Sequence, residues 1–262
     1  LLLLTIVLSG PTLSLAENPG NGSKSGWEET FFKANEAYRE GRFQEAVKGY
    51  LRVIRLGHDG PRIQYNLGNA YFRMNQLGRA IVAYERAHVA IPRDADLNFN
   101  LAHARDQVMD AIPPSKGFFN MAFFWLPSVN LMELFWCFAL LNLALWAAFL
   151  IRLFHRSEWL FYVLLLVLSL WFVMGISFGM KWTQIHNDDR AVILQKEVGV
   201  LAGPHAGDTL LFKLHEGSMV AQERAEEGWR LIRLPDKKRG WLRSEAVELI
   251  APKGANLEDT LK

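Results

Sequence analysis

Hydrophobic residues are concentrated in two long uncharged runs in the middle of the chain, at 134–151 and 159–180. A bilayer core about 30 Å thick is crossed by roughly 20 apolar helical residues. Both runs are long enough, the first with help from 129–133, and only 152–158 connects them. The pattern therefore predicts a helical hairpin with transmembrane helices at 129–151 and 159–180. An aromatic-rich segment at 113–128 is expected to lie at the membrane interface before it.

The charges beside the hairpin predict its orientation. The connector carries Arg152, His155 and Arg156, whereas no Lys or Arg lies between Lys116 and the first run. Cytoplasmic loops are enriched in basic residues, so we expect the connector to be a cytoplasmic loop. The flanking modules would then both be periplasmic, in a protein of the bacterial inner membrane.

The N-terminal residues 1–16 are uncharged, too short for a comfortable span, and end in small residues at Ser14 and Ala16. These features predict a secretory signal peptide. There is no initiator Met and no basic segment, so we expect the chain to begin inside that signal. The alternative is an N-terminal anchoring helix. The polar segment 17–26 is expected to be a linker.

A helix-type pattern recurs between 27 and 94 with a period of 34 residues, which pairs Ala46 with Ala80 and Tyr50 with Tyr84. A period of this length is typical of stacked helical repeats. We expect two units, 27–60 and 61–94, each made of two helices. A partial copy at 95–111 is expected to be a capping helix, because the exposed end of a repeat array needs covering.

The second unit resembles the tetratricopeptide repeat (TPR), whose signature positions are occupied by Gly68, Tyr71, Ala80, Tyr84, Ala87 and Pro92. Small residues let the two helices of a unit touch, and proline stops the second helix. The resemblance implies a TPR α-solenoid over 27–112 with a concave groove that binds proteins. By analogy with the family, we expect the protein-binding groove to be formed by Asn35, Tyr38, Arg39, Asn69, Phe72, Arg73 and His103.

Some TPR proteins hold a C-terminal carboxylate with paired Asn and Lys or Arg residues. Asn35 and Asn66 fit part of that pattern, but Phe31 and Asp96 stand where basic residues would be required. The sequence therefore argues against such a clamp. Aromatic and arginine side chains often anchor protein interfaces, although Phe31 and Tyr65 could instead belong to the core.

Short alternating runs with Gly- and Pro-containing turns follow at roughly ten-residue spacing over 188–250. They predict a small β-barrel. The positions of Gly203-Pro204, Gly217, Gly228-Trp229 and Gly240-Trp241-Leu242 resemble those of the bacterial SH3-like domain. The resemblance implies a candidate ligand surface at Trp229 and Trp241, the alternative being that both rings pack inside the barrel. We expect a flexible tail at 251–262.

Composition narrows the function further. The net charge of +2 argues against a dedicated nucleic-acid binder. The only cysteine, Cys137, excludes a disulfide framework, a cysteine-based zinc site and a CxxC motif. The catalytic motifs HExxH and GxSxG, the P-loop and the dinucleotide fingerprint are not found. We expect no enzyme activity, cofactor or metal, and an envelope hydrolase remains the alternative because triads assemble only in the fold.

The predicted fold class is thus a multi-domain α plus small β protein. Its order of TPR α-solenoid, two transmembrane helices and C-terminal SH3-like β-barrel resembles the aerotolerance-operon (Bat) family over nearly the whole chain. The resemblance implies a non-enzymatic periplasmic scaffold in an envelope-stress complex. Its partners would be envelope proteins, including MoxR-associated membrane proteins with von Willebrand A domains. The alternative function is binding or sensing of peptidoglycan peptides in the cell wall.

Overall fold

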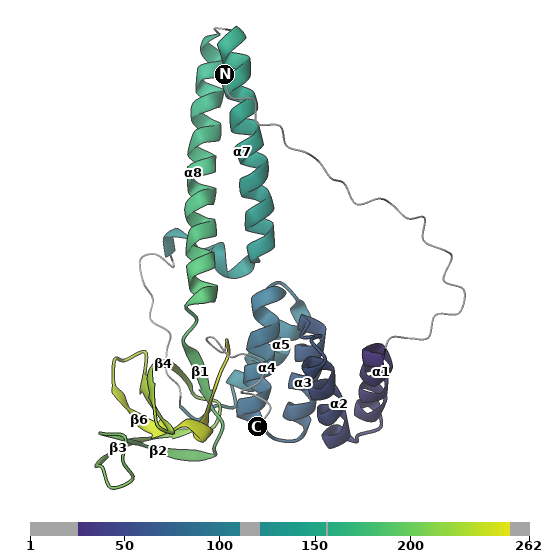
Figure 1. Ribbon diagram of the computed structural model, residues 1–262, viewed down its shortest axis with the longest axis vertical. Coiled ribbons are helices and arrows are strands. Elements are labelled where there is room, and N and C mark those ends of the chain that lie inside the picture. Colours follow the sequence, from purple (N-terminus) through teal and green to yellow (C-terminus); the bar gives the residue numbers. More distant parts are fainter. Residues whose placement is uncertain (1–25, 111–120, 156, 252–262) are drawn as a thin grey trace.

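The computed structural model describes residues 26–110, 121–155 and 157–251 (Figure 1). Several predicted segments lie outside the described residues: the signal at 1–16, the linker except Gly26, and the tail beyond 251. The same holds for Arg156 and for the first part of the interfacial segment. The description below covers a helical module, a helical hairpin and a β module.

The helical module consists of two antiparallel helix pairs and a further helix. They are α1 (Gly26–Arg39), α2 (Phe43–Arg55), α3 (Pro61–Arg73), α4 (Leu77–Ala90) and α5 (Ala95–Arg105). Pro61 begins α3, where its missing N–H costs nothing. The Asp94 carboxylate accepts a hydrogen bond from the Leu97 N–H at 2.9 Å and caps α5. Local sequence signals therefore set where these helices start.

Small residues bring the two helices of each unit into contact. A Cβ atom at Gly68 of α3 would lie 2.6 Å from the ring of Tyr84 on α4. In the first unit, a Cβ atom at Gly49 of α2 would lie 2.6 Å from Cβ of Ala34 on α1. Real Cβ atoms do not approach that closely, so the close crossing of each pair depends on a glycine.

Two long helices, α7 (Leu131–Phe154) and α8 (Glu158–His186), form the hairpin after the short helix η1 (Leu126–Ser128). Asn130 and Glu133 begin α7 with a reciprocal capping box. Both helices are long and apolar enough to cross a membrane. Most of their apolar side chains are exposed, and the hairpin projects away from the two other modules (Figure 1).

The β module is one antiparallel sheet of seven strands in the order β3-β2-β6-β5-β4-β1-β7. The strands are β1 (Arg190–Ile193), β2 (Glu197–Leu201), β3 (Leu210–His215), β4 (Met219–Glu226), β5 (Trp229–Arg233), β6 (Arg239–Arg243) and β7 (Val247–Leu249), with η2 (Ser244–Ala246) before β7. Alternation along the strands directs Ile193, Val200, Ile232 and Leu242 into a shared core.

The closed barrel that the sequence pattern predicts does not form. In the described part of the chain β3 pairs with β2 alone and β7 with β1 alone, so the two edge strands do not meet. The end of β7 contacts helix α4 instead. The guanidinium of Arg86 on α4 donates to the carbonyls of Leu249 and Ile250 at 2.8 and 2.9 Å. The module is an open antiparallel sheet that abuts the helical repeat.

The helical and β modules pack against each other through α4, β1 and β7. Val192 of β1 and Ile250, just after β7, join the hydrophobic core of the helical module. The Gly78 N–H of α4 donates to the Glu216 carboxylate at 2.9 Å. Since the hairpin separates these modules in the chain, their contact places both outer ends of the hairpin on one side (Figure 1).

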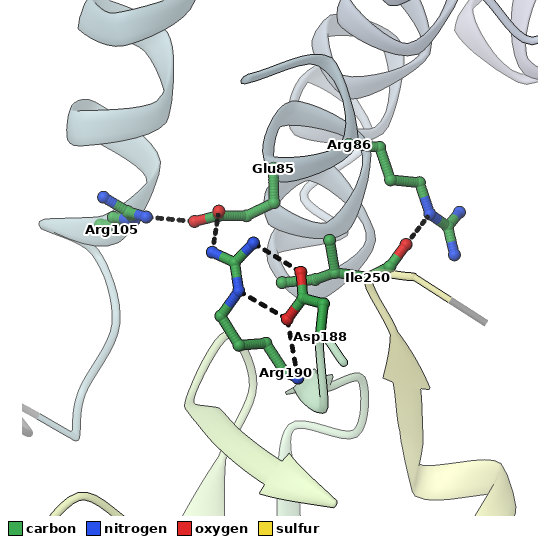
Figure 2. Close-up of polar contacts among 6 residues, drawn as sticks. All are labelled: Glu85, Arg86, Arg105, Asp188, Arg190 and Ile250. Atoms are coloured by element: carbon green, nitrogen blue, oxygen red, sulfur yellow. Dashed lines mark hydrogen bonds and ion pairs between the residues drawn. The ribbon is translucent and has the colours of Figure 1, made fainter. Parts of the chain in front are cut away.

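A buried carboxylate lies at the centre of this contact, as Figure 2 shows. Glu85 of α4 is only 1% exposed and accepts hydrogen bonds from Arg105 and from Arg190, the latter at 3.0 Å. Arg190 also donates to both oxygens of Asp188, at 2.8 and 2.7 Å. A buried charge needs partners of opposite sign, and here one comes from each module. We call Glu85, Arg105, Asp188 and Arg190 the interface ion cluster.

A second polar contact joins the modules at Asp110, beyond α5. Its carboxylate accepts hydrogen bonds from the Ser218 hydroxyl and from the His215 N–H, the latter at 2.7 Å, and contacts His215 Nδ1 at 2.9 Å. Burial acts to raise the pKa of Asp110, but the hydrogen bonds from Ser218 and His215 outweigh it, so the pKa is lowered. The ionised carboxylate therefore stabilises the interface.

This lowered pKa predicts a pH dependence of stability. Because the folded-state pKa lies below the unfolded value of about 3.9, the stabilisation is complete above that value and is lost as pH falls through the folded pKa. Asp110→Asn should remove this component. The urea midpoints of the wild-type chain and the Asp110→Asn chain, both measured in detergent micelles, should therefore converge below about pH 4. A constant difference between them across the acid range would contradict the assignment. Glu197 lies 3.9 Å from Nε2 of His215 and is unchanged in the variant, so it does not account for a difference between the two chains.

Candidate protein-binding groove

The concave side of the helical module contains two adjoining hollows. The first, of about 320 Å³, is lined by Phe31, Asn35, Tyr38, Arg39, Tyr50, Arg62, Asn66 and Asn69. The second, of about 160 Å³, is lined by Tyr38, Asn69, Phe72, Arg73, Tyr84, Asn100 and His103. Tyr38 and Asn69 belong to both, so the hollows form one groove along α1, α3 and α5. The structure brings together all seven residues that the sequence predicted for it.

A hydrogen-bond network recurs with the period of the repeat. The Asn35 amide oxygen accepts from the Tyr50 hydroxyl at 2.8 Å and from Asn66 Nδ2 at 3.0 Å. One repeat later, the Asn69 amide oxygen accepts from the Tyr84 hydroxyl at 2.7 Å and from Asn100 Nδ2 at 3.0 Å. Each link joins neighbouring helices of the stack. The two copies together form what we call the asparagine ladder.

The asparagine ladder orients donors toward the groove. Because both acceptor sites face the protein, the amide nitrogens of Asn35 and Asn69 are the free ends of these side chains. Neither nitrogen has a hydrogen-bond partner within the described residues. Each can donate to a carbonyl or carboxylate oxygen of a ligand. The burial that holds Tyr50 and Tyr84 in place also raises the pKa of both phenols, which therefore remain hydrogen-bond donors.

The charged side chains of the groove are arginines. Arg39 donates from Nε to the Asn35 carbonyl at 3.3 Å. The Arg73 guanidinium lies over the ring of Phe43, 4.8 Å from its centre. Arg62 stands one turn before Asn66 on the same face of α3. No Asp or Glu lines either hollow in the part of the chain that the structure describes. The groove is therefore an electropositive surface.

Aromatic rings cluster at the end of the groove beside α5. The imidazole of His103 lies 5.5 Å from the ring of Phe72 and 6.3 Å from that of Phe99, to which it is nearly parallel. Phe99 is 72% exposed. Large exposed aromatic side chains at a concave surface are typical anchors for a partner. We refer to Phe72, Phe99 and His103 as the aromatic slot.

Some groove residues escaped the sequence reasoning. Arg62 and Asn100 line the hollows but were not in the predicted set. The period could have found Asn100, which lies one repeat after Asn66. The helical rule could have found Arg62, because residues four apart on a helix share a face. Of the two uncertain aromatic residues, Phe31 lines the groove, while the Tyr65 hydroxyl accepts from Asn100 Nδ2 at 3.0 Å.

The two tryptophans expected at a ligand surface lie on neighbouring strands of the sheet. Trp229 of β5 is 8% exposed and Trp241 of β6 is 9% exposed. The Arg243 guanidinium covers the Trp229 ring, 4.4 Å from its centre. Neither ring is open as a stacking platform, and a ligand surface at this place stays a prediction.

Comparison with known proteins identifies part of the helical module. A sequence model described as TPR repeat matches residues 34–75, which include the end of α1 and all of α2 and α3. No curated protein gives a significant match to the chain. The matched segment contains Asn35, Asn69 and Arg73 of the groove. Repeats of this kind present concave binding surfaces. The chain thus contains a TPR repeat, which indicates protein–protein interaction.

Proposed function

We propose that this chain is a non-enzymatic, membrane-anchored scaffold that binds partner proteins in its TPR groove. The observation that carries the proposal is the groove itself, in which the asparagine ladder, arginines and exposed aromatic rings are held on rigid helices. These side chains are the ones that recognise polypeptides, whose backbone offers carbonyl oxygens at regular intervals. The SH3-like domain suggested by the turn spacing of the β module would add a second contact surface.

The hairpin supports membrane anchoring. Leu143, Phe149 and Leu166 are each at least half exposed, and so are many of their apolar neighbours. A hydrocarbon layer is the environment that covers such a surface without cost. At the tip, Arg152 donates to the Ser157 carbonyl at 3.1 Å and lies over the ring of Phe161. Basic residues there favour a cytoplasmic connector. Both modules would then be periplasmic.

The proposed order of parts also resembles the Bat family, as the sequence indicates. On that basis the partners would be envelope proteins, including MoxR-associated membrane proteins with von Willebrand A domains, and the process would be aerotolerance. The support for this assignment is the resemblance alone. The groove and the contact between the modules are independent of it.

Photo-crosslinking in intact cells tests the scaffold function. A photoreactive amino acid in place of Phe72 should give discrete crosslinked protein bands, because this side chain lies in the groove. The matched control is Leu51, which is exposed on α2 and does not line the groove. Asn69→Ala combined with Arg73→Ala should abolish the bands from position 72. Identical bands from both positions, or no bands from either, would disprove docking in the groove.

Thiol labelling tests the topology separately. In a Cys137→Ser background, Ser157→Cys should stay unlabelled by a membrane-impermeant maleimide in spheroplasts, and Arg55→Cys should be labelled. Both positions should react after the membrane is permeabilised. Labelling of position 157 in intact spheroplasts would reverse the proposed orientation.

A further inference from the structure

The groove arginines lack the ion pairs that several other arginines form in the part of the chain that the structure describes. Arg39, Arg62 and Arg73 form no ion pair with a described residue. By contrast, Arg42, Arg86 and Arg190 each contact a carboxylate of the protein. Guanidinium groups pair readily with carboxylates, often through two parallel hydrogen bonds. The groove therefore holds positive charge that the protein itself leaves uncompensated.

These charges are spread along the groove. Arg62 and Arg73 stand at opposite ends of α3, about 16 Å apart along its axis at 1.5 Å per residue. Arg39 occupies the place in the first unit that Arg73 occupies in the second. A small anion would reach only one of these groups, whereas an extended chain with several carboxylates can reach all three. The asparagine ladder between them supplies amide donors for the backbone of such a chain.

The opposite side of the groove has a different character. On α5, Phe99 and His103 of the aromatic slot stand in place of arginines, and Asp96 lies one turn before Asn100. This side favours an apolar or aromatic side chain and disfavours a carboxylate. The groove thus has an electropositive side on α1 and α3 and an aromatic side on α5.

We propose that the groove binds an extended acidic segment from within a partner protein, with its acidic residues over α1 and α3 and an aromatic residue in the aromatic slot. This inference rests on the proposed scaffold function and specifies its ligand. An internal segment fits better than a chain end. Phe31 and Asp96 stand where the carboxylate clamp of other TPR proteins has basic residues, so the chain lacks the clamp by which those proteins hold a free C-terminus.

Fluorescence anisotropy with the full chain in detergent micelles tests the proposal. The probe is a fluorescein-labelled peptide that alternates Glu with Ser and carries one Trp near its C-terminal end, with both ends blocked. Arg39→Gln, Arg62→Gln and Arg73→Gln should each weaken binding by about tenfold, or about 1.4 kcal/mol, because each removes one charged donor that pairs with a carboxylate of the peptide. Arg55→Gln removes the same charge from an exposed position of α2 outside the groove and should have no effect.

Three comparisons make the result specific. A peptide with Lys in place of Glu should not bind. Phe99→Ser should weaken the binding of the probe that carries Trp and leave the binding of a probe without Trp unchanged. Unblocking the C-terminus should leave the affinity unchanged. Far-UV circular dichroism of each variant checks that the helices remain folded.

Failure of this inference is distinguishable from failure of the scaffold function. If crosslinks from position 72 persist while the acidic peptide does not bind, the ligand class is wrong and docking stands. Equal loss from Arg55→Gln and Arg62→Gln would reduce the effect to overall charge and overturn the proposal. Tighter binding of a single-stranded oligonucleotide than of the peptide would also overturn it, because arginines and aromatic rings serve both ligands.

Discussion

Glu85→Leu should lower the free energy of unfolding of the full chain by about 3 kcal/mol. The substitution removes a carboxylate that is 1% exposed and leaves Arg105 and Arg190 without it. Breaking a buried ion pair is costly because the remaining charge stays partly desolvated. The effect should fall at the lower end of the usual range, since Arg190 retains both hydrogen bonds to Asp188. Urea titration in detergent micelles measures it.

Two further variants control for this result. Lys33→Gln breaks an exposed ion pair with Glu29 and should leave the urea midpoint unchanged, because exposed pairs contribute little. Adding Arg105→Met to Glu85→Leu should recover part of the loss, because Glu85 is the only described carboxylate that Arg105 pairs with and two apolar side chains then face each other. If the Glu85→Leu variant has the same urea midpoint as the wild-type chain, the interface ion cluster does not hold the modules together.

Tyr84→Ala should destabilise the helical module by about 3–5 kcal/mol, the usual cost of removing a buried aromatic ring. Tyr84 is 1% exposed, its ring packs on Gly68, and its hydroxyl holds the Asn69 amide. The substitution therefore leaves a cavity between α3 and α4 and releases one copy of the asparagine ladder. Thermal unfolding followed by far-UV circular dichroism, together with peptide anisotropy, measures both consequences.

Tyr84→Phe separates the two roles of this side chain. It keeps the ring and removes only the hydrogen bond to Asn69, so the stability loss should be about 1 kcal/mol. Tyr50→Phe makes the equivalent change in the first unit and should behave alike. Weaker peptide binding with nearly normal stability is expected of both. If Tyr84→Phe lowered the stability of the helical module as much as Tyr84→Ala, the packing of the Tyr84 ring would not be what stabilises the module.

The helical repeat was predictable because its determinants are periodic. Gly68, Tyr84 and Pro92 fix one helix pair, and the 34-residue spacing then projects groove positions from one unit to the next. The same logic yields the asparagine ladder, since Asn35 and Asn69 are repeat equivalents. The two apolar helices were predictable for a different reason, because hydropathy over a long uncharged stretch depends on no distant contact.

The β module and its contacts were less predictable. The turn residues foretold strands at about the right places, but alternation does not determine whether edge strands meet. The end of β7 is bound by Arg86 of the helical module, a contact that the strand pattern does not encode. Glu85 gave no signal either. In the sequence it resembles any polar residue of an amphipathic helix, and its partner Arg190 is reached only after the hairpin. Contacts of this kind are set by tertiary packing.

The interface ion cluster has a consequence for biogenesis. Synthesis proceeds from the N-terminus, so the helix that carries Glu85 emerges well before the strand that carries Arg190. In the proposed topology both apolar helices must be inserted before the two residues can meet. A chain whose hairpin failed to return would leave this carboxylate on one side of the bilayer and its guanidinium on the other. In that topology the pair can form only after the hairpin has inserted completely, and a misinserted chain would leave the buried Glu85 carboxylate without Arg190.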